Sequence, residues 1–278
     1  MADINRRSLT LMALLAPLAR VWSQPETPSA ISEKPQAHPN PGHRPTFWTR
    51  NDQIAMLVYP QMTVLDLIGP QYMFALLQGA EVHLVAKSLA PVTSDTGVTL
   101  MPTINFESCP KHLTVLFAPG GSDAGSEGVL ATMEDAETRA FMADRGSRAT
   151  YVTSVCTGSL ILGAAGLLKG YKATSHWAAR EVLADFGAIP TDARVVRDRN
   201  RITGAGVTAG LDFGLQMAAL LRDPNYAECM QLMCEYDPHP PFQAGSLHSA
   251  PAAVQSTMSL LLSGFTASAH ARAKKLSA

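Results

Sequence analysis

One cysteine of this sequence, Cys156, stands where a strand pattern gives way to a helix pattern. Residues 151–155 are rich in β-branched and aromatic side chains, as in a short buried strand. Apolar residues at helical spacing follow the cysteine: Leu160, Ile161, Ala164, Leu167 and Leu168. This order predicts a nucleophile elbow, and the positive end of the helix dipole predicts a thiol that ionises more readily than a free cysteine. The alternative interpretation is a buried structural cysteine.

A carboxylate among apolar neighbours is the second residue with notable chemistry. Asp66 is flanked by leucines and follows residues 54–59, a continuous apolar run that predicts a buried parallel strand. We expect the aspartate on the loop beyond this strand, before a helix that spans residues 70–77 and begins at a proline. Burial would raise its pKa and suit it to proton transfer. The alternative is a turn or N-cap aspartate.

Two glycines follow another predicted strand, at residues 112–118. Gly120 and Gly121 come just after the strand ends, and paired glycines leave backbone N–H groups free to approach a ligand or a developing negative charge. The alternative is a plain tight turn.

The remaining patterns alternate between strands and helices, which is typical of α/β folds. We expect a strand at residues 81–86, hairpins at 91–101 and 194–203, one amphipathic helix at 125–145, and helices at 204–221 and 224–236. The glycine run at the start of residues 204–221 lacks the acidic partner of a dinucleotide site, so we do not expect such a cofactor there.

Two motifs carry a resemblance to a known family. Residues 154–158, Ser-Val-Cys-Thr-Gly, and residues 173–177, Ala-Thr-Ser-His-Trp, resemble motifs of the PfpI/ThiJ superfamily, whose fold is similar to that of class I glutamine amidotransferases. Further matching stretches lie at residues 65–70, 118–121, 203–210 and 240–245. The resemblance covers residues 52–251 and implies a flavodoxin-like three-layer sandwich with a mostly parallel central sheet.

Within the superfamily, the sequence is most similar to the isonitrile hydratase branch. That resemblance implies a lyase in which Cys156 attacks an isonitrile, forms a thioimidate, and releases an N-substituted formamide after water adds. It implies that Asp66 positions water and moves protons, and that Thr157, next to the nucleophile, donates a hydrogen bond. No metal or other cofactor is expected, the substrate is a small molecule, and a homodimer is typical of the family.

The same resemblance assigns expected places to three further residues. It places Gly120 and Gly121 opposite the elbow as an oxyanion or substrate cradle. It also brings His176 toward the cysteine, where the histidine could orient or charge the site.

Two other functions remain open. One is a stress protein that acts on reactive carbonyls or senses oxidation through Cys156. Those relatives usually carry glutamate where this sequence has Asp66, which favours the hydratase branch. The other is the ligand-sensing domain of AraC-type regulators, which has a similar elbow, but this sequence contains no basic recognition helix.

Composition limits the classes of partner. The chain has 278 residues, a formal net charge of −1 and no block of basic residues. A nucleic-acid-binding surface is therefore not expected. Hydrophobic residues make up 46% of the chain, which is ample for one large α/β core.

The N-terminal residues predict an export signal. Arg6 and Arg7 precede an apolar run at residues 9–19, which is too short to span a bilayer. We interpret residues 1–23 as a twin-arginine-type signal peptide, the alternative being a disordered tail. The protein would then be periplasmic without stable membrane insertion after signal removal, and cytoplasmic if the signal is not used.

The rest of the chain divides into three predicted segments. These are a Pro-rich linker at residues 24–50, the PfpI-like domain at 51–250, and a C-terminal helix or tail at 251–278. Four cysteines are present. Twin-arginine export carries folded proteins, so we expect the thiols to form reduced in the cytoplasm, and we interpret three of the four cysteines as structural and unpaired.

Overall fold

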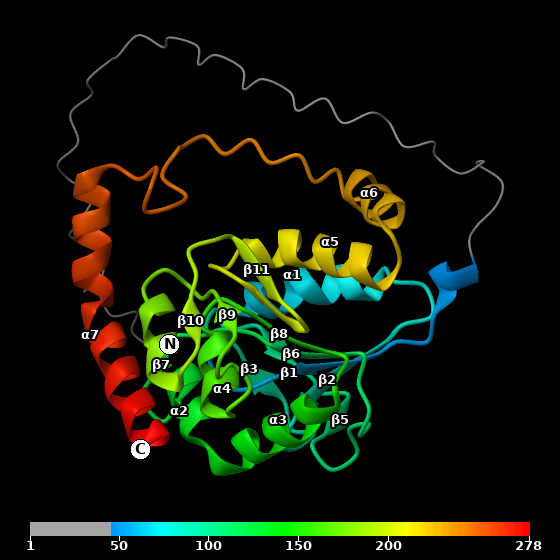
Figure 1. The fold of residues 1–278 in the computed structure, drawn as a ribbon, viewed down its shortest axis with the longest axis horizontal. Helices are drawn as coiled ribbons and strands as arrows, with labels where there is room; N and C mark the ends of the chain where they lie inside the picture. Colours follow the sequence, from blue (N-terminus) through cyan, green and yellow to red (C-terminus); the bar gives the residue numbers. More distant parts are fainter. Residues whose placement is uncertain (1–45) are drawn as a thin grey trace, which may run out of the picture. The chain divides into compact units, whose positions relative to one another are not determined.

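A seven-stranded sheet forms the centre of the computed structural model, which describes residues 46–278 (Figure 1). The strand order is β11–β12–β8–β6–β1–β2–β5, and every neighbouring pair is parallel except β11 and β12. The strands are β1 (Gln53–Leu57), β2 (Glu81–Ala86), β5 (Ile104–Asn105), β6 (Val115–Ala118), β8 (Tyr151–Val155), β11 (Val195–Asp198) and β12 (Arg201–Gly204). The predicted α/β fold with a mostly parallel sheet is confirmed. The predicted signal peptide and most of the predicted linker lie outside the described residues.

Helices cover both faces of this sheet (Figure 1). One layer contains α1 (Val64–Ala75), α5 (Ala209–Leu221) and α6 (Pro224–Met233), and the other contains α2 (Gly128–Glu134), α3 (Ala136–Arg148) and α4 (Gly158–Ala164). The central strands β1 and β6 are apolar over residues 54–57 and 115–118, and neither face of these residues meets water. Strand β8 is buried as well from Val152 onward, but it includes the polar residues Thr153 and Ser154. This arrangement is the three-layer sandwich that the resemblance implied.

Short elements complete the fold. They are the 3₁₀ helices η1 (Thr46–Thr49) and η2 (Arg180–Phe186), the hairpin of β3 (Val92–Thr93) and β4 (Thr99–Leu100), β7 (Asp123–Ala124), and the parallel pair β9 (Lys172–Ala173) and β10 (Ile189–Pro190). Both predicted hairpins are confirmed, at β3–β4 and at β11–β12.

Three helix predictions were wrong. The helix expected from residue 204 begins only at Ala209, because Gly204 is the last residue of β12. Helix α1 begins at Val64 rather than at Pro70, so it contains this proline, and Asp66 lies in its first turn rather than on a loop. The single helix predicted for residues 125–145 is two helices, because Asp135 interrupts it. The carboxylate of Asp135 accepts a hydrogen bond from the backbone N–H of Thr138 at 2.7 Å and so caps the start of α3.

A buried arginine ties the start of β1 to the end of α5. The side chains of Arg222 and Asp52 are both fully buried, and Nη1 of the arginine lies 2.5 Å from Oδ2 of the aspartate. The guanidinium also donates to the backbone carbonyls of Trp48, Arg50, Gln78 and Leu221. Because the guanidinium has partners for its N–H groups, this buried ion pair holds the segment that leads into β1 in place.

The C-terminal helix α7 (Ala252–Ser277) packs against η2, α2 and α4. Residues 234–251, drawn in orange in Figure 1, join it to α6. Within residues 46–278, no helix is long and apolar enough to cross a membrane.

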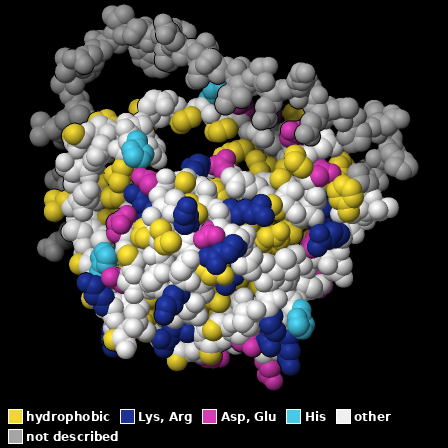
Figure 2. All heavy atoms as spheres, viewed as in Figure 1, with side chains coloured by type: hydrophobic (Ala, Val, Ile, Leu, Met, Phe, Trp, Pro, Cys, Tyr) yellow, Lys and Arg dark blue, Asp and Glu magenta, His cyan; other side chains and the backbone are white. Residues whose placement is uncertain are grey.

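The surface shown in Figure 2 mixes the two signs of charge. Lysine and arginine side chains alternate with aspartate and glutamate over this face, and neither sign forms a large continuous block.

Candidate active site

The predicted elbow at Cys156 is confirmed in its geometry. The cysteine follows β8 directly and precedes α4, and its φ angle is +58°. A non-glycine residue in this left-handed region is strained by about 1–3 kcal/mol and must be held by its surroundings. The backbone N–H of Cys156 lies 3.1 Å from the carbonyl oxygen of Gly204 and 2.7 Å from that of Ala205, and its own carbonyl accepts from the hydroxyls of Ser159 and Ser175.

Asp66 faces the elbow from the first turn of α1 and is fully buried. Its Oδ2 accepts a hydrogen bond from the backbone N–H of Gly120 at 3.1 Å, while Oδ1 has no partner among the described residues. Burial raises the pKa of Asp66 from 3.8 to about 7, and the hydrogen bonds from Cys156 and Gly120 limit that rise. The predicted burial and raised pKa of this carboxyl group are confirmed.

Gly120 allows the two reactive side chains to meet. A Cβ atom at this position would lie 2.6 Å from Oδ2 of Asp66, 2.7 Å from the backbone nitrogen of Thr157 and 2.8 Å from Cβ of Cys156. No side chain fits in this space, because all three distances are shorter than real Cβ contacts. The carboxyl group, the elbow and the glycine therefore pack into one small volume, and only glycine is compatible with it.

Thr157 and Gly121 form a reciprocal pair beside the cysteine. The hydroxyl of Thr157 donates to the carbonyl oxygen of Gly121 at 2.7 Å and accepts from its N–H at 2.9 Å. The N–H of Gly120 is likewise taken by Asp66. The expectation that the glycine N–H groups are free was therefore wrong, since both already have partners that hold the site together. Contact of these glycines with a substrate stays a prediction.

The thiol itself differs from the prediction. Burial raises the pKa of Cys156 well above that of a free cysteine, and the carboxyl group of Asp66 raises it further. The backbone N–H of Thr157 acts in the opposite direction, but it does not outweigh burial. The expectation of a readily ionised thiol was wrong, because the short helix α4 cannot offset loss of water and a neighbouring carboxylate. All four cysteines are unpaired, including the three interpreted as structural.

A pocket of about 370 Å³ leads to the cysteine. Its walls combine Cys156, Thr157 and Gly121 with Leu262 and Phe265 of α7. The two α7 side chains give the pocket an apolar wall, which suits a small substrate with a hydrocarbon group. Sequence reasoning missed them, because nothing in a weakly patterned C-terminal helix indicates what it covers.

His176 borders the same pocket. Burial lowers the pKa of His176, which favours the neutral imidazole. Its Nδ1 accepts a hydrogen bond from the backbone N–H of Ala178 at 3.3 Å. The structure thus brings His176 to the pocket as a neutral side chain, and a part in catalysis stays a prediction. Among residues 46–278, no cluster of three or more His, Cys, Asp or Glu side chains is arranged to hold a metal ion.

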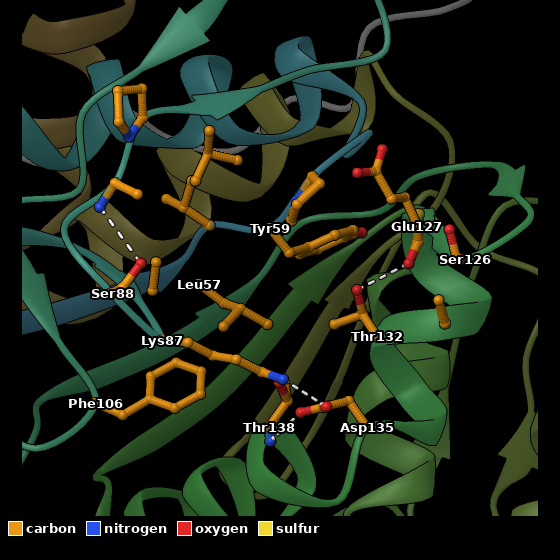
Figure 3. Close-up of a pocket in the computed structure, with 18 residues that line it drawn as sticks. Leu57, Tyr59, Lys87, Ser88, Phe106, Ser126, Glu127, Thr132, Asp135 and Thr138 are labelled. Atoms are coloured by element: carbon orange, nitrogen blue, oxygen red, sulfur yellow. Dashed lines mark hydrogen bonds and ion pairs between the residues drawn. The ribbon is translucent and has the colours of Figure 1, made fainter.

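Tyr59 is a residue of the site that sequence reasoning missed. It lies shortly after the end of β1, and its ring lines a second pocket, which does not include Cys156 (Figure 3). Lys87 and Asp135, which form an ion pair, also line this pocket. Its buried hydroxyl donates to the carbonyl oxygen of Pro119 at 3.0 Å. The tyrosine therefore separates this second pocket from the loop that carries Gly120.

A sequence model of the DJ-1/PfpI family matches residues 52–220. The chain belongs to this family. Isonitrile hydratase of Pseudomonas putida is 52% identical over 202 residues, which cover 73% of this chain and 86% of that protein. The crystal structure of a THiJ/PfpI family protein from Pseudomonas syringae has 65% sequence identity and a TM-score of 0.81, covering 86% of this chain and 97% of that one.

Other members of the DJ-1/PfpI family carry different activities in their names. A deglycase of Thermococcus kodakarensis is 31% identical over 140 residues, which cover 50% of this chain and 81% of that protein. The resemblance to the superfamily is confirmed, and the choice among its reactions depends on the geometry of the site.

Proposed function

We propose that this protein hydrates isonitriles to N-substituted formamides, with Cys156 as the nucleophile. The observation that carries the proposal is the buried pair of Cys156 and Asp66 at an apolar pocket, with a carboxyl pKa of about 7. The similarity to the isonitrile hydratase of Pseudomonas putida supports the same reaction. An isonitrile is small, apolar and uncharged, and such a molecule suits a pocket walled by Leu262 and Phe265.

The raised pKa of the thiol makes Asp66 the base of the first step. The carboxylate takes the thiol proton as the sulfur attacks the terminal isonitrile carbon and forms a C–S bond. The carboxylic acid then returns this proton to the same carbon, which gives a thioimidate. A base with a pKa near the working pH is best suited to such transfers in both directions. The unpaired Oδ1 is the oxygen available for them.

Water completes the reaction. It adds to the thioimidate carbon, one of its protons moves to the nitrogen, and Asp66 accepts the other. The C–S bond then breaks, the carbonyl forms, and the thiolate recovers a proton from Asp66. The net reaction adds one water to one isonitrile and yields one formamide. We assign to the N–H of Thr157, directly after the nucleophile, the donation of a hydrogen bond to charge that develops on the substrate, as in other elbow enzymes.

Sensing of oxidation by Cys156 is disfavoured by the same geometry. Redox-sensor cysteines are exposed and have a low pKa, whereas Cys156 is 5% exposed and its pKa is raised.

The test is formamide production from alkyl and aryl isonitriles by the full chain. We expect Cys156→Ala and Asp66→Asn to abolish turnover, and Cys229→Ala, which changes an exposed cysteine, to keep wild-type activity. Loss with Cys156→Ala alone would remove Asp66 as the base. A folded wild type that hydrates none of several isonitriles would refute the proposal and leave a carbonyl substrate for the same thiol.

A further inference from the structure

One peptide unit connects Tyr59 to the reactive pair. The hydroxyl of Tyr59 donates to the carbonyl oxygen of Pro119, and the N–H of Gly120 donates to Oδ2 of Asp66. This C=O and this N–H belong to the same peptide bond, which is planar. A rotation of the peptide plane would therefore break both hydrogen bonds together, and the tyrosine fixes the direction in which the N–H points.

The peptide needs such an anchor because it precedes a glycine. Glycine permits backbone conformations that other residues avoid, so a reversed Pro119–Gly120 peptide has little steric cost of its own. The hydrogen bond to the carbonyl also polarises the peptide and strengthens its N–H as a donor. Tyr59 thus holds the N–H of Gly120 on the carboxylate of Asp66.

The surrounding groups keep Tyr59 in its donor form. Burial raises the pKa of Tyr59 well above its ordinary value, and Asp66, Cys156 and Asp95 raise it further. On its other side the ring lines the second pocket, which Lys87, Glu127 and Asp135 also line (Figure 3). The phenol is therefore protonated throughout the pH range in which Asp66 titrates.

We propose that Tyr59 is a positioning residue of the hydration reaction, which acts through the Pro119–Gly120 peptide on the carboxyl group of Asp66. The inference rests on the function proposed above for Asp66. It assigns a role to a side chain that touches neither the substrate pocket of Cys156 nor the reacting atoms.

The test compares Tyr59→Phe with Tyr226→Phe. Tyr226 is a matched control, because its buried hydroxyl also donates to a backbone carbonyl, that of Leu76 at 2.8 Å, and it does not line the pocket of Cys156. We expect Tyr59→Phe to lower kcat/KM about 10-fold, because it weakens a hydrogen bond to a charged group. A carboxylate that loses an N–H donor has a higher pKa. The midpoint of the rise in activity with pH should therefore lie about one pH unit higher in Tyr59→Phe than in the wild type. Tyr226→Phe should leave the pH profile in place.

The titration of Asp66 can also be followed without turnover, by the infrared absorption of its protonated carboxyl group, with Asp66→Asn to assign the band. Tyr59→Phe should move this titration to higher pH. The inference is overturned if Asp66 titrates at the same pH in Tyr59→Phe and in the wild type. It is also overturned if both tyrosine variants lose activity equally and keep the wild-type pH–activity profile. An absence of isonitrile hydration in the wild type would refute the proposed function, while the infrared titration would still decide whether Tyr59 acts on Asp66.

Discussion

Replacement of Asp66 by asparagine should stabilise the protein at alkaline pH while it removes activity. The pKa of Asp66 is about 7 in the folded protein against 3.8 for an ordinary aspartate. At 1.36 kcal/mol per unit, this shift costs the folded state about 4 kcal/mol when the group is ionised. Asparagine has a similar shape and stays uncharged, so the variant avoids this cost.

The sign of the pH dependence follows from the raised pKa. The folded protein keeps a proton that the unfolded chain has already lost, so the stabilising contribution is complete below pH 3.8 and declines as the pH rises to about 7. Between about pH 5 and about pH 8, the free energy of unfolding of the wild type should fall by about 3 kcal/mol more than that of Asp66→Asn.

Urea unfolding curves at a series of pH values measure this difference. Asp237→Asn, which changes an exposed carboxylate, should keep the wild-type pH dependence. The reasoning is refuted if the wild type and Asp66→Asn show the same slope of stability against pH. If Asp66→Asn is less stable than the wild type at about pH 8, the ionised carboxylate of Asp66 does not destabilise the folded protein, contrary to the inference from its burial.

Two further predictions concern packing. Gly120→Ala should lower activity about 100-fold, since displacement of reacting groups by about 1 Å has an effect of this size, while Gly245→Ala, where a Cβ meets nothing within 4 Å, should be active in the same formamide assay. Full activity of Gly120→Ala would contradict the close packing around this glycine. Arg222→Met should lower the free energy of unfolding by about 3–5 kcal/mol, because it removes the buried partner of the fully buried Asp52 and leaves it with the exposed Arg50 at 3.2 Å. Urea unfolding checks this, with the exposed Arg199→Met as the control, and an equal change in both would refute it.

The parts of the site that the sequence predicted depend on local patterns. The switch from strand to helix periodicity located Cys156, and the apolar neighbours of Asp66 indicated its burial. Helix α1 was placed too late because Pro70 normally begins a helix, whereas packing against α5 tolerates it inside one.

The parts that the sequence did not predict depend on tertiary contacts. The pKa of the thiol is set by burial and by a carboxyl group 90 residues earlier in the chain, and neither is visible in the motif around Cys156. Tyr59 was indistinguishable from the other residues of an apolar run. Leu262 and Phe265 reach the pocket from a helix whose own pattern is weak.

The depth and high pKa of Cys156 have a consequence for chemical labelling. General alkylating reagents select exposed thiolates, and Cys229 is an exposed cysteine, whereas Cys156 is 5% exposed and protonated at neutral pH. A survey of reactive cysteines with such a reagent would therefore report Cys229 and pass over the nucleophile. A probe for Cys156 must be small, uncharged and shaped like the substrate, so that Asp66 removes the thiol proton only after the probe has entered the pocket.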